Sequence, residues 1–187
     1  MAPAKKLAHV VLQTNRFATM RDWYLTVLDA RIVYQNEMIA FLTFDDEHHR
    51  LAIAHIPGAA ERTPLTVGLS HTAYTFPTLA GLLDKYEHLR ALGIEPRVPV
   101  QHGVTTSLYY RDPDGNYVEL QIDNFATPDE ATRYMEGPEY GADMAGPTFD
   151  PAAMSAALRA GTPVSELTSR QWAAQFPQAD VVALLTT

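Results

Sequence analysis

The sequence has no cysteine among its 187 residues. Disulfides and thiolate ligands are therefore excluded, and any metal site must use histidine, aspartate or glutamate. No stretch approaches the roughly 20 apolar residues that a membrane-spanning helix needs. The opening residues, MAPAKKLAHV, run directly into an expected strand. We therefore expect no signal peptide and a cytoplasmic protein.

Basic residues are outnumbered by acidic ones, which gives a formal net charge of −8. This charge argues against nucleic acid and against an anionic membrane as partners. Apolar residues make up 47% of the chain and charged residues 19%, values typical of a folded globular protein. The length suits one domain with a real hydrophobic core.

An internal repeat organises the first two thirds of the chain. Apolar and β-branched runs predict strands at 7–14, 31–35, 38–44 and 50–56, with helical spacing at 17–28. The same order returns as strands at 67–76, 94–98, 105–111 and 116–123, with a helix at 79–92. The pattern predicts an α+β fold of two tandem βαβββ modules, about 6–57 and 66–124, within a region 1–126.

The composition changes after this region. Residues 127–187 are expected to form a C-terminal tail of short helices that belongs to the same domain. Pro and cap residues predict helices at 128–135 and 151–160. A third helix is expected from about residue 162 towards residue 176.

A hairpin at 107–123 carries the most informative carboxylate. Its turn reads Asp-Pro-Asp-Gly, in which Pro113 presets φ and Gly115 tolerates a positive φ. On the following strand the period of two separates Val118 and Leu120 from Glu119. Glu119 is therefore expected on a polar face that looks at water, a ligand or a metal.

Two histidines, like Glu119, are expected inside apolar strands. His9 and His71 occupy corresponding places in the first strands of the two modules. Unpaired polar groups are costly to bury in such strands. Two imidazoles and one carboxylate form the ligand set of a facial triad that leaves metal positions open. We therefore predict a metal site made by His9, His71 and Glu119, with the modules forming a mixed curved sheet around it.

These features resemble the vicinal oxygen chelate superfamily, which includes glyoxalases, bleomycin-resistance proteins and extradiol dioxygenases. The resemblance is strongest to small one-domain type I extradiol dioxygenases, the enzymes of catechol and biphenyl-2,3-diol cleavage. It implies Fe(II) at the triad, with Mn(II) as an alternative, and O2 as co-substrate. It also implies a small aromatic diol as substrate and a homo-oligomer, a dimer or larger.

The segment FDDEHHRLAI is similar to the His-His signature of the extradiol enzymes. The resemblance makes His49, the second histidine of the pair, the acid–base residue. The family usually has Arg before this pair, whereas this chain has Glu47. His55, at the end of the same strand, is the competing candidate for the base.

Two further residues match positions near the metal in the family. His102 lies in the segment PVQHGV, and Tyr109 lies ten residues before Glu119. The resemblance implies that both hydrogen-bond the reacting oxygens. Tyr109 would lie opposite Glu119 on the same face if the hairpin has the matching register, whereas a shift by one residue would point it away.

The resemblance thus implies an extradiol, or meta, ring-cleaving dioxygenase of aromatic degradation. The alternative is a metal-dependent isomerase or lyase of the same fold, such as a glyoxalase or an epimerase. A glyoxalase would need a second carboxylate in the strand RLAIAHI, which has none. A metal-free binding protein of the bleomycin-resistance kind would have no use for a complete triad.

Overall fold

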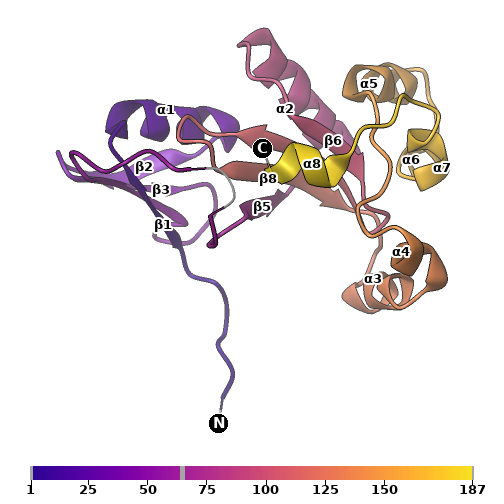
Figure 1. Ribbon diagram of the computed structural model, residues 1–187, viewed down its shortest axis with the longest axis horizontal. Helices are drawn as coiled ribbons and strands as arrows, with labels where there is room; N and C mark the ends of the chain where they lie inside the picture. Colours follow the sequence, from indigo (N-terminus) through magenta and orange to yellow (C-terminus); the bar gives the residue numbers. More distant parts are fainter. Residues whose placement is uncertain (1, 64–65, 187) are drawn as a thin grey trace. The chain divides into compact units, whose positions relative to one another are not determined.

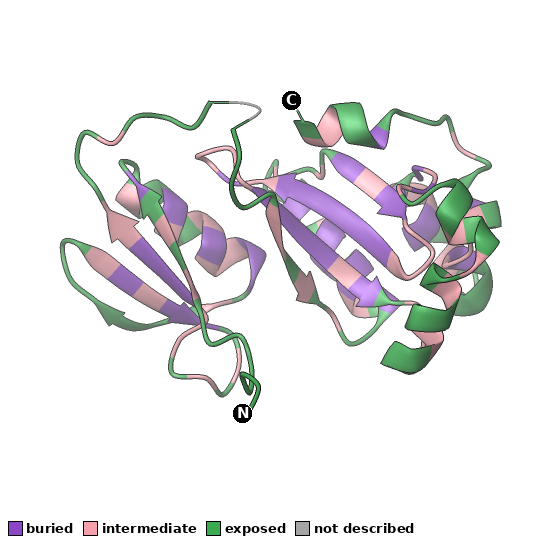
Figure 2. Cartoon of the chain, turned by 60° about the horizontal axis from the view of Figure 1, so that its bottom comes forward, coloured by how far each residue is buried: buried purple, intermediate pink, exposed green. Residues whose placement is uncertain are grey.

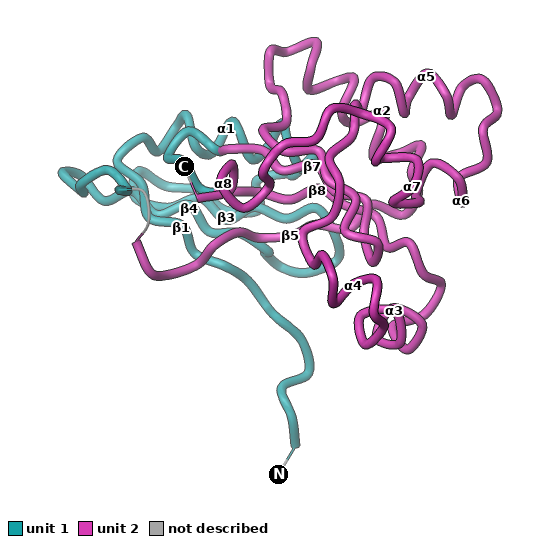
Figure 3. Tube along the Cα trace, turned by 45° about the vertical axis from the view of Figure 1, so that its right-hand side comes forward, with its two compact units in different colours: residues 1–63, 112–116 teal, residues 64–111, 117–187 magenta. Residues whose placement is uncertain are grey.

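The computed structural model describes residues 2–63 and 66–186. The chain divides into two compact units, residues 1–63 with 112–116 and residues 64–111 with 117–187 (Figure 3). Each unit contains one four-stranded sheet (Figure 1). The described residues include no helix long and apolar enough to span a membrane.

The first unit contains β1 (Val10–Thr14), α1 (Phe17–Val27), β2 (Arg31–Gln35), β3 (Ile39–Thr43) and β4 (Leu51–His55). The strand order is β1-β4-β3-β2, with β1 parallel to β4 and the other pairs antiparallel. Helix α1 buries Met20, Tyr24 and Val27, which are spaced by four and three residues and so share one side of the helix. This side packs on one face of the sheet.

The Asp-Pro-Asp-Gly turn belongs to the first unit and has the predicted form. Gly115 adopts φ 84°, and its amide donates to the Asp112 carbonyl at 2.9 Å. The Asp112 carboxylate is buried and accepts from the Tyr24 hydroxyl at 2.9 Å and from the Asn116 amide at 2.8 Å. Burial raises the pKa of Asp112, and these hydrogen bonds oppose the rise.

The second unit contains β5 (His71–Thr75), α2 (Leu79–Ala91), β6 (Val98–Gln101), β7 (Thr105–Arg111) and β8 (Tyr117–Asp123). Its order, β5-β8-β7-β6, and its single parallel pair, β5 with β8, repeat the arrangement of the first unit. Strands β7 and β8 are buried along most of their length (Figure 2). The predicted α+β fold of two βαβββ modules is confirmed.

Some strand boundaries differ from the prediction. Strands β1 and β5 begin at Val10 and His71, later than expected, because their pairing registers begin with Leu51 and Tyr117. Strand β6 lies at Val98–Gln101 instead of 94–98. The chain leaving α2 first makes a left-handed helix end, in which Gly93 adopts φ 77° and the Ile94 amide returns to the Leu89 carbonyl at 2.9 Å.

The tail is helical and belongs to the second unit. It contains α3 (Pro128–Met135), α4 (Pro138–Ala142), α5 (Pro151–Arg159), α6 (Val164–Leu167), α7 (Arg170–Ala173) and α8 (Val181–Thr186). The first and third of these were expected, whereas α4 and α8 were not. The expected helix from residue 162 to residue 176 is divided, because the Ser169 side chain accepts from the Trp172 amide and starts a new helix there.

The tail covers part of the second sheet. The Gln101 amide at the edge strand β6 donates to the Pro147 carbonyl at 2.9 Å. Val181 of α8 joins a buried cluster with Val98, Val100, Tyr109 and Tyr117. The Tyr117 hydroxyl donates to the carbonyl of Leu184 at 2.5 Å. Helix α8 therefore packs on the face of the sheet that carries Tyr109.

Candidate functional site

Glu119 lies in the middle of β8 and is only 4% exposed. The register pairs it with Tyr109 of β7 and with Ala73 of β5. Of the two registers that the sequence left open, the hairpin therefore has the one that places Tyr109 opposite Glu119, and both side chains share one face. The His71 Nε2 atom lies 3.2 Å from the Glu119 Oε2 atom. The second unit thus brings one predicted imidazole ligand into contact with the predicted carboxylate ligand.

Hydrogen bonding keeps the Glu119 carboxylate ionised despite its burial. Desolvation by burial raises the pKa of Glu119, whereas hydrogen bonds with His71 and Ser107 lower it. The lowering effects together are larger, so the pKa lies below the usual value. The sequence interpretation missed Ser107. It lies two residues before Tyr109 on β7, so strand periodicity could have placed it on the same face.

Tyr109 and His102 form a pair beside Glu119. The His102 Nε2 atom lies 3.1 Å from the Tyr109 hydroxyl, and the rings meet edge to face. Burial and the neighbouring Glu119 charge raise the pKa of Tyr109. Burial lowers the pKa of His102, although backbone hydrogen bonds with Ala145 and Met144 oppose this. Both shifts favour the neutral form near pH 7, in which each side chain can donate and accept hydrogen bonds.

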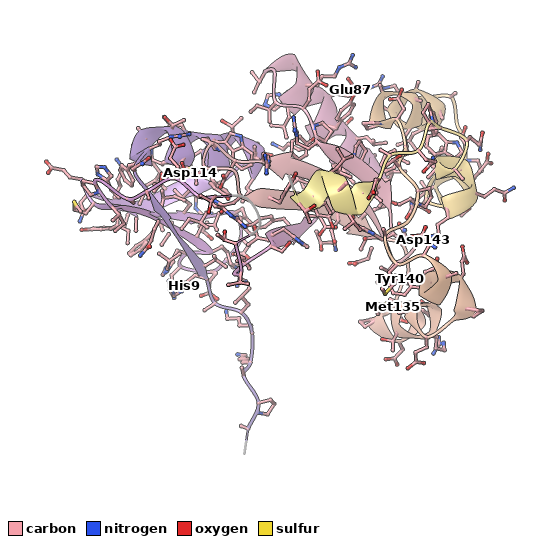
Figure 4. All side chains as sticks on the ribbon, in the orientation of Figure 1. His9, Glu87, Asp114, Met135, Tyr140 and Asp143 are labelled. Atoms are coloured by element: carbon pink, nitrogen blue, oxygen red, sulfur yellow. The ribbon has the colours of Figure 1, made fainter. Side chains whose placement is uncertain are left out.

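His9 and His49 come together in the first unit. His9 lies immediately before β1 (Figure 4), and its ring centroid is 4.3 Å from that of His49. The His49 Nδ1 atom lies 2.6 Å from the His48 Nδ1 atom. Burial, followed by the charges of His9 and His48, lowers the pKa of His49. An imidazole with a lowered pKa is present as the free base at neutral pH.

His55 lies on the other face of the same sheet. It is paired with Thr14, and its ring stacks on Phe17 of α1 at 5.7 Å. Side chains along β1 alternate between faces, so His9, five residues before Thr14, is directed away from α1. His49 therefore accompanies His9, whereas His55 does not.

The charge of Glu47, the residue at which this chain departs from the family signature, is neutralised locally. Its carboxylate pairs with Lys6 and lies 3.9 Å from Arg50. The hydrogen bond with Lys6 is the main cause of a lowered pKa. The backbone carbonyl of Glu47 accepts from the Thr43 hydroxyl at 2.9 Å, which orders the loop leading to His49.

The predicted site residues fall into two groups. The second unit brings together His71, Glu119, Tyr109 and His102, and the first unit brings together His9 and His49. Among residues 2–63 and 66–186, the part of the chain that the structure describes, no group of three His, Asp or Glu side chains is arranged to hold one metal ion. Of the three predicted ligands, His9 belongs to the first unit, and His71 and Glu119 belong to the second.

Comparison with known proteins identifies the family. The sequence model of the glyoxalase/bleomycin resistance protein/dioxygenase superfamily matches residues 6–120. The chain belongs to this superfamily. The matched residues include His9, His71 and Glu119.

Two curated relatives are similar over nearly their whole length. Biphenyl-2,3-diol 1,2-dioxygenase 2 of Rhodococcus globerulus is 62% identical over 174 residues, which cover 92% of each chain. Biphenyl-2,3-diol 1,2-dioxygenase 3 of the same organism is 60% identical over an alignment that covers 100% of both chains. The likeness therefore includes the C-terminal tail.

Among solved structures, the glyoxylase/bleomycin resistance protein/dioxygenase domain from Frankia sp. EAN1pec superposes with a TM-score of 0.54 at 18% identity. The superposition covers 65% of this chain and 99% of that domain. At this identity the likeness supports the fold alone.

Proposed function

We propose that this chain is an extradiol ring-cleaving dioxygenase that opens a catechol-type diol, with biphenyl-2,3-diol as the first candidate. The observation that carries the proposal is the 60–62% identity to two biphenyl-2,3-diol 1,2-dioxygenases over 92% or more of the chain. The reaction adds one O2 to the diol and breaks the ring bond beside the two hydroxyls.

The donor set fits a non-heme Fe(II) ion held by His9, His71 and Glu119. The observation that supports this fit is a buried carboxylate whose pKa is lowered and which lies 3.2 Å from an imidazole nitrogen. When bound, Fe(II) would supply a Lewis acid and an electron source through which diol and O2 react. The same ligands would accept Mn(II).

His49 would act as the acid–base residue. Its lowered pKa favours the neutral imidazole, which is the form that accepts a proton from a diol hydroxyl. The contact between His48 and the Nδ1 atom of His49 leaves Nε2 for this transfer. The proton would later return to the opened product.

Tyr109 and His102 would hydrogen-bond the oxygens of the substrate. Tyr109 is a phenol with a raised pKa, so it remains a donor throughout the neutral range. Its hydrogen bond with His102 fixes the direction of its hydroxyl. Preorganised donors of this kind stabilise charge as it develops on a reacting oxygen.

An oxygen electrode tests the proposal. Protein purified anaerobically is analysed for metal and then mixed with 2,3-dihydroxybiphenyl or catechol in air. We expect bound iron, oxygen uptake and a yellow ring-opened product. Bound nickel, zinc or cobalt without oxygen uptake would contradict the proposal and favour an isomerase or lyase.

We also expect the cytoplasmic, homo-oligomeric state that the resemblance implies, with neither nucleic acid nor membrane as a partner. Light scattering on the protein as it leaves a size-exclusion column measures the molar mass and hence the number of subunits. A mass equal to one chain at micromolar concentration would contradict the oligomer.

A further inference from the structure

His102 lies in the turn between β6 and β7, and side chains of the second unit hold the backbone on both sides of it. The Gln101 side-chain amide donates to the Thr106 hydroxyl at 2.7 Å, and its side-chain oxygen accepts from Asn124 at 2.7 Å. Asn124 also donates to the Gly103 carbonyl at 2.9 Å. These bonds fix the backbone at His102 and leave the direction of its imidazole to other contacts.

The imidazole of His102 meets the C-terminal tail. Its Nε2 atom faces the Tyr109 hydroxyl at 3.1 Å, and its ring donates to the backbone carbonyls of Met144 and Ala145. A neutral imidazole that donates through one nitrogen has only the other nitrogen as an acceptor. The tail carbonyls therefore favour one tautomer of His102, in which Nε2 accepts.

Gly146 brings the tail against the residue that precedes His102. It adopts φ 83°, and a Cβ atom at this position would lie 2.0 Å from the Gln101 carbonyl oxygen. Both observations exclude a side chain here. The Gln101 amide donates to the Pro147 carbonyl at 2.9 Å and continues the contact. We call residues 143–146 the cradle segment, because their backbone lies against the His102 turn.

Arg170, the first residue of α7, holds the start of the cradle segment. Its side chain is only 11% exposed, and its Nη2 atom donates to the Asp143 carbonyl. Its Nη1 atom donates to the Glu139 carbonyl at 3.3 Å. Asp143 follows α4 directly, where the last carbonyls of a helix lack donors within it, so Arg170 caps this helix (Figure 4). The Asp143 carboxylate accepts from the Gly146 amide at 3.0 Å, which closes the segment.

The contacts of Arg170 require the geometry of arginine. The planar guanidinium reaches two carbonyls through separate nitrogens, whereas the ammonium of lysine is a single point charge. The guanidinium also lies against the cradle segment, since its Nη2 atom would be 3.0 Å from a Cβ atom at Gly146. Burial and, to a smaller extent, the Arg170 charge lower the pKa of His102, which agrees with this proximity.

We propose that Arg170 is a positioning residue for His102 and acts through the cradle segment, whose Met144 and Ala145 carbonyls hold the imidazole. The inference rests on the proposed function and gives the C-terminal tail a part in it, because the tail orients the ring that would hydrogen-bond the substrate oxygens. Removal of the Arg170 guanidinium should therefore slow the chemical step while iron and diol still bind.

The first experiment follows the His102 ring in the full-length protein, kept free of iron because iron would broaden the signals. NMR on protein with isotope-labelled histidine records the ring nitrogens, and His102→Phe assigns them. In the wild type we expect two well-separated signals, as for a single tautomer. In Arg170→Met, which keeps an apolar stem and removes the donors, the two signals should move towards each other.

Two further variants accompany this measurement. Asp143→Ala removes the bond to the Gly146 amide at a side chain that is 53% exposed, so it tests the cradle segment without emptying a buried site. It should move the His102 signals in the same direction. Arg159→Met, at an arginine that is 64% exposed and pairs with Glu87, is the matched control and should leave them unchanged.

The second experiment is a double-mutant cycle on the iron-loaded enzyme. We expect Arg170→Met to lower kcat per bound iron by about 10- to 100-fold, the usual cost of a displaced catalytic group. KM for 2,3-dihydroxybiphenyl should stay within about twofold of the wild-type value. In the His102→Phe background the same substitution should change kcat by less than about twofold, because the group on which it acts is already absent.

The two experiments separate this inference from the proposed function. A wild type without oxygen uptake would contradict the proposed function alone, and the NMR signals would still decide the role of Arg170. Unchanged His102 signals in both Arg170→Met and Asp143→Ala, or an equal change in Arg159→Met, would overturn the inference. An equal loss of kcat with and without His102 would also overturn it, because Arg170 would then act on the fold in general.

Discussion

Equivalent faces of the two sheets differ in burial and in polarity. In the second module the face opposite α2 carries Glu119 and Tyr109, each 4% exposed, and it is packed by α8. In the first module the face opposite α1 carries a row of rings formed by His9, His49, Phe41 and Tyr34, in which Phe41 and His49 are half-buried and Tyr34 is 52% exposed. One repeated topology therefore supports a buried polar network in one copy and an open apolar surface in the other.

The difference has an identifiable cause in the tail. Residues 127–187 belong to the second unit, where Val181 and Leu184 meet the sheet, and the first module has no corresponding segment among its residues 2–63. A covered face can hold an ionised carboxylate through fixed hydrogen bonds, which an open face would leave to water. An open face can instead receive a ligand.

The largest effect is expected from breaking the polar network itself. Glu119→Gln should lose bound iron and activity together, because a neutral amide replaces the only carboxylate of the proposed ligand set. Metal analysis and oxygen uptake on the same sample measure both losses. Glu87→Gln, which changes a carboxylate on α2 that pairs with Arg159, is the matched control and should keep iron and activity. A Glu119→Gln protein with full iron content would contradict the ligand assignment.

The next effect concerns the proton-transfer residue of the first module. His49→Phe should keep iron but lower turnover by about 10²- to 10⁴-fold, the usual contribution of general acid–base catalysis. His55→Phe, on the opposite face, should retain turnover near that of the wild type. The opposite pattern, with His55→Phe inactive and His49→Phe active, would show that the base is assigned to the wrong face.

A smaller effect is expected from the turn that belongs to the first unit. Asp112→Ala should lower the free energy of unfolding by about 1–3 kcal/mol, because it leaves the buried Tyr24 hydroxyl and turn amides without their acceptor. Tyr24→Phe removes one of these hydrogen bonds and should cost about 1 kcal/mol. Urea unfolding measures both values. Equal stability of the wild type and Asp112→Ala would show that the hydrogen bonds accepted by Asp112 do not stabilise the turn.

The smallest effect concerns the cover over the second sheet. Tyr117→Phe should cost about 1 kcal/mol of stability, because it removes the hydrogen bond to Leu184 of α8. Tyr110→Phe is the control, since the buried Tyr110 hydroxyl has no hydrogen-bond partner among the described residues. Thermal unfolding should show a lower Tm for Tyr117→Phe than for Tyr110→Phe. Equal values would mean that the hydrogen bond to α8 contributes nothing.

Periodicity was sufficient to predict the modules and the hairpin. The period of two and the Asp-Pro-Asp-Gly turn left two registers open for Tyr109, and the structure has the one that pairs it with Glu119. The helix from Pro128 to Met135 was also predicted, because its capping residues are adjacent in sequence. Local signals of this kind depend on neighbouring residues alone.

Features that depend on tertiary contacts were not predictable. Helix α8 has only six residues, and its position depends on contacts with Val98 and Tyr117, which are distant in sequence. Tyr34 pairs with Phe41 because β2 has an irregularity between Ile32 and Tyr34, and no Gly, Pro or other turn residue in β2 indicates this irregularity. The sequence favoured His49 over His55 only through the family resemblance, and the register of β1 with β4 adds that His55 lies on the face that carries α1. The roles of the site residues remain predictions until the variants above are measured.

The most direct test of the central claim is the identity of the product formed from 2,3-dihydroxybiphenyl in air. Mass spectrometry and NMR on the product, combined with oxygen uptake, determine both the stoichiometry and the broken bond. We predict one O2 consumed for each diol and a ring opened beside the two hydroxyls, with the phenyl group retained. An unchanged diol, or a ring opened between the hydroxyls, would contradict the assignment as an extradiol dioxygenase.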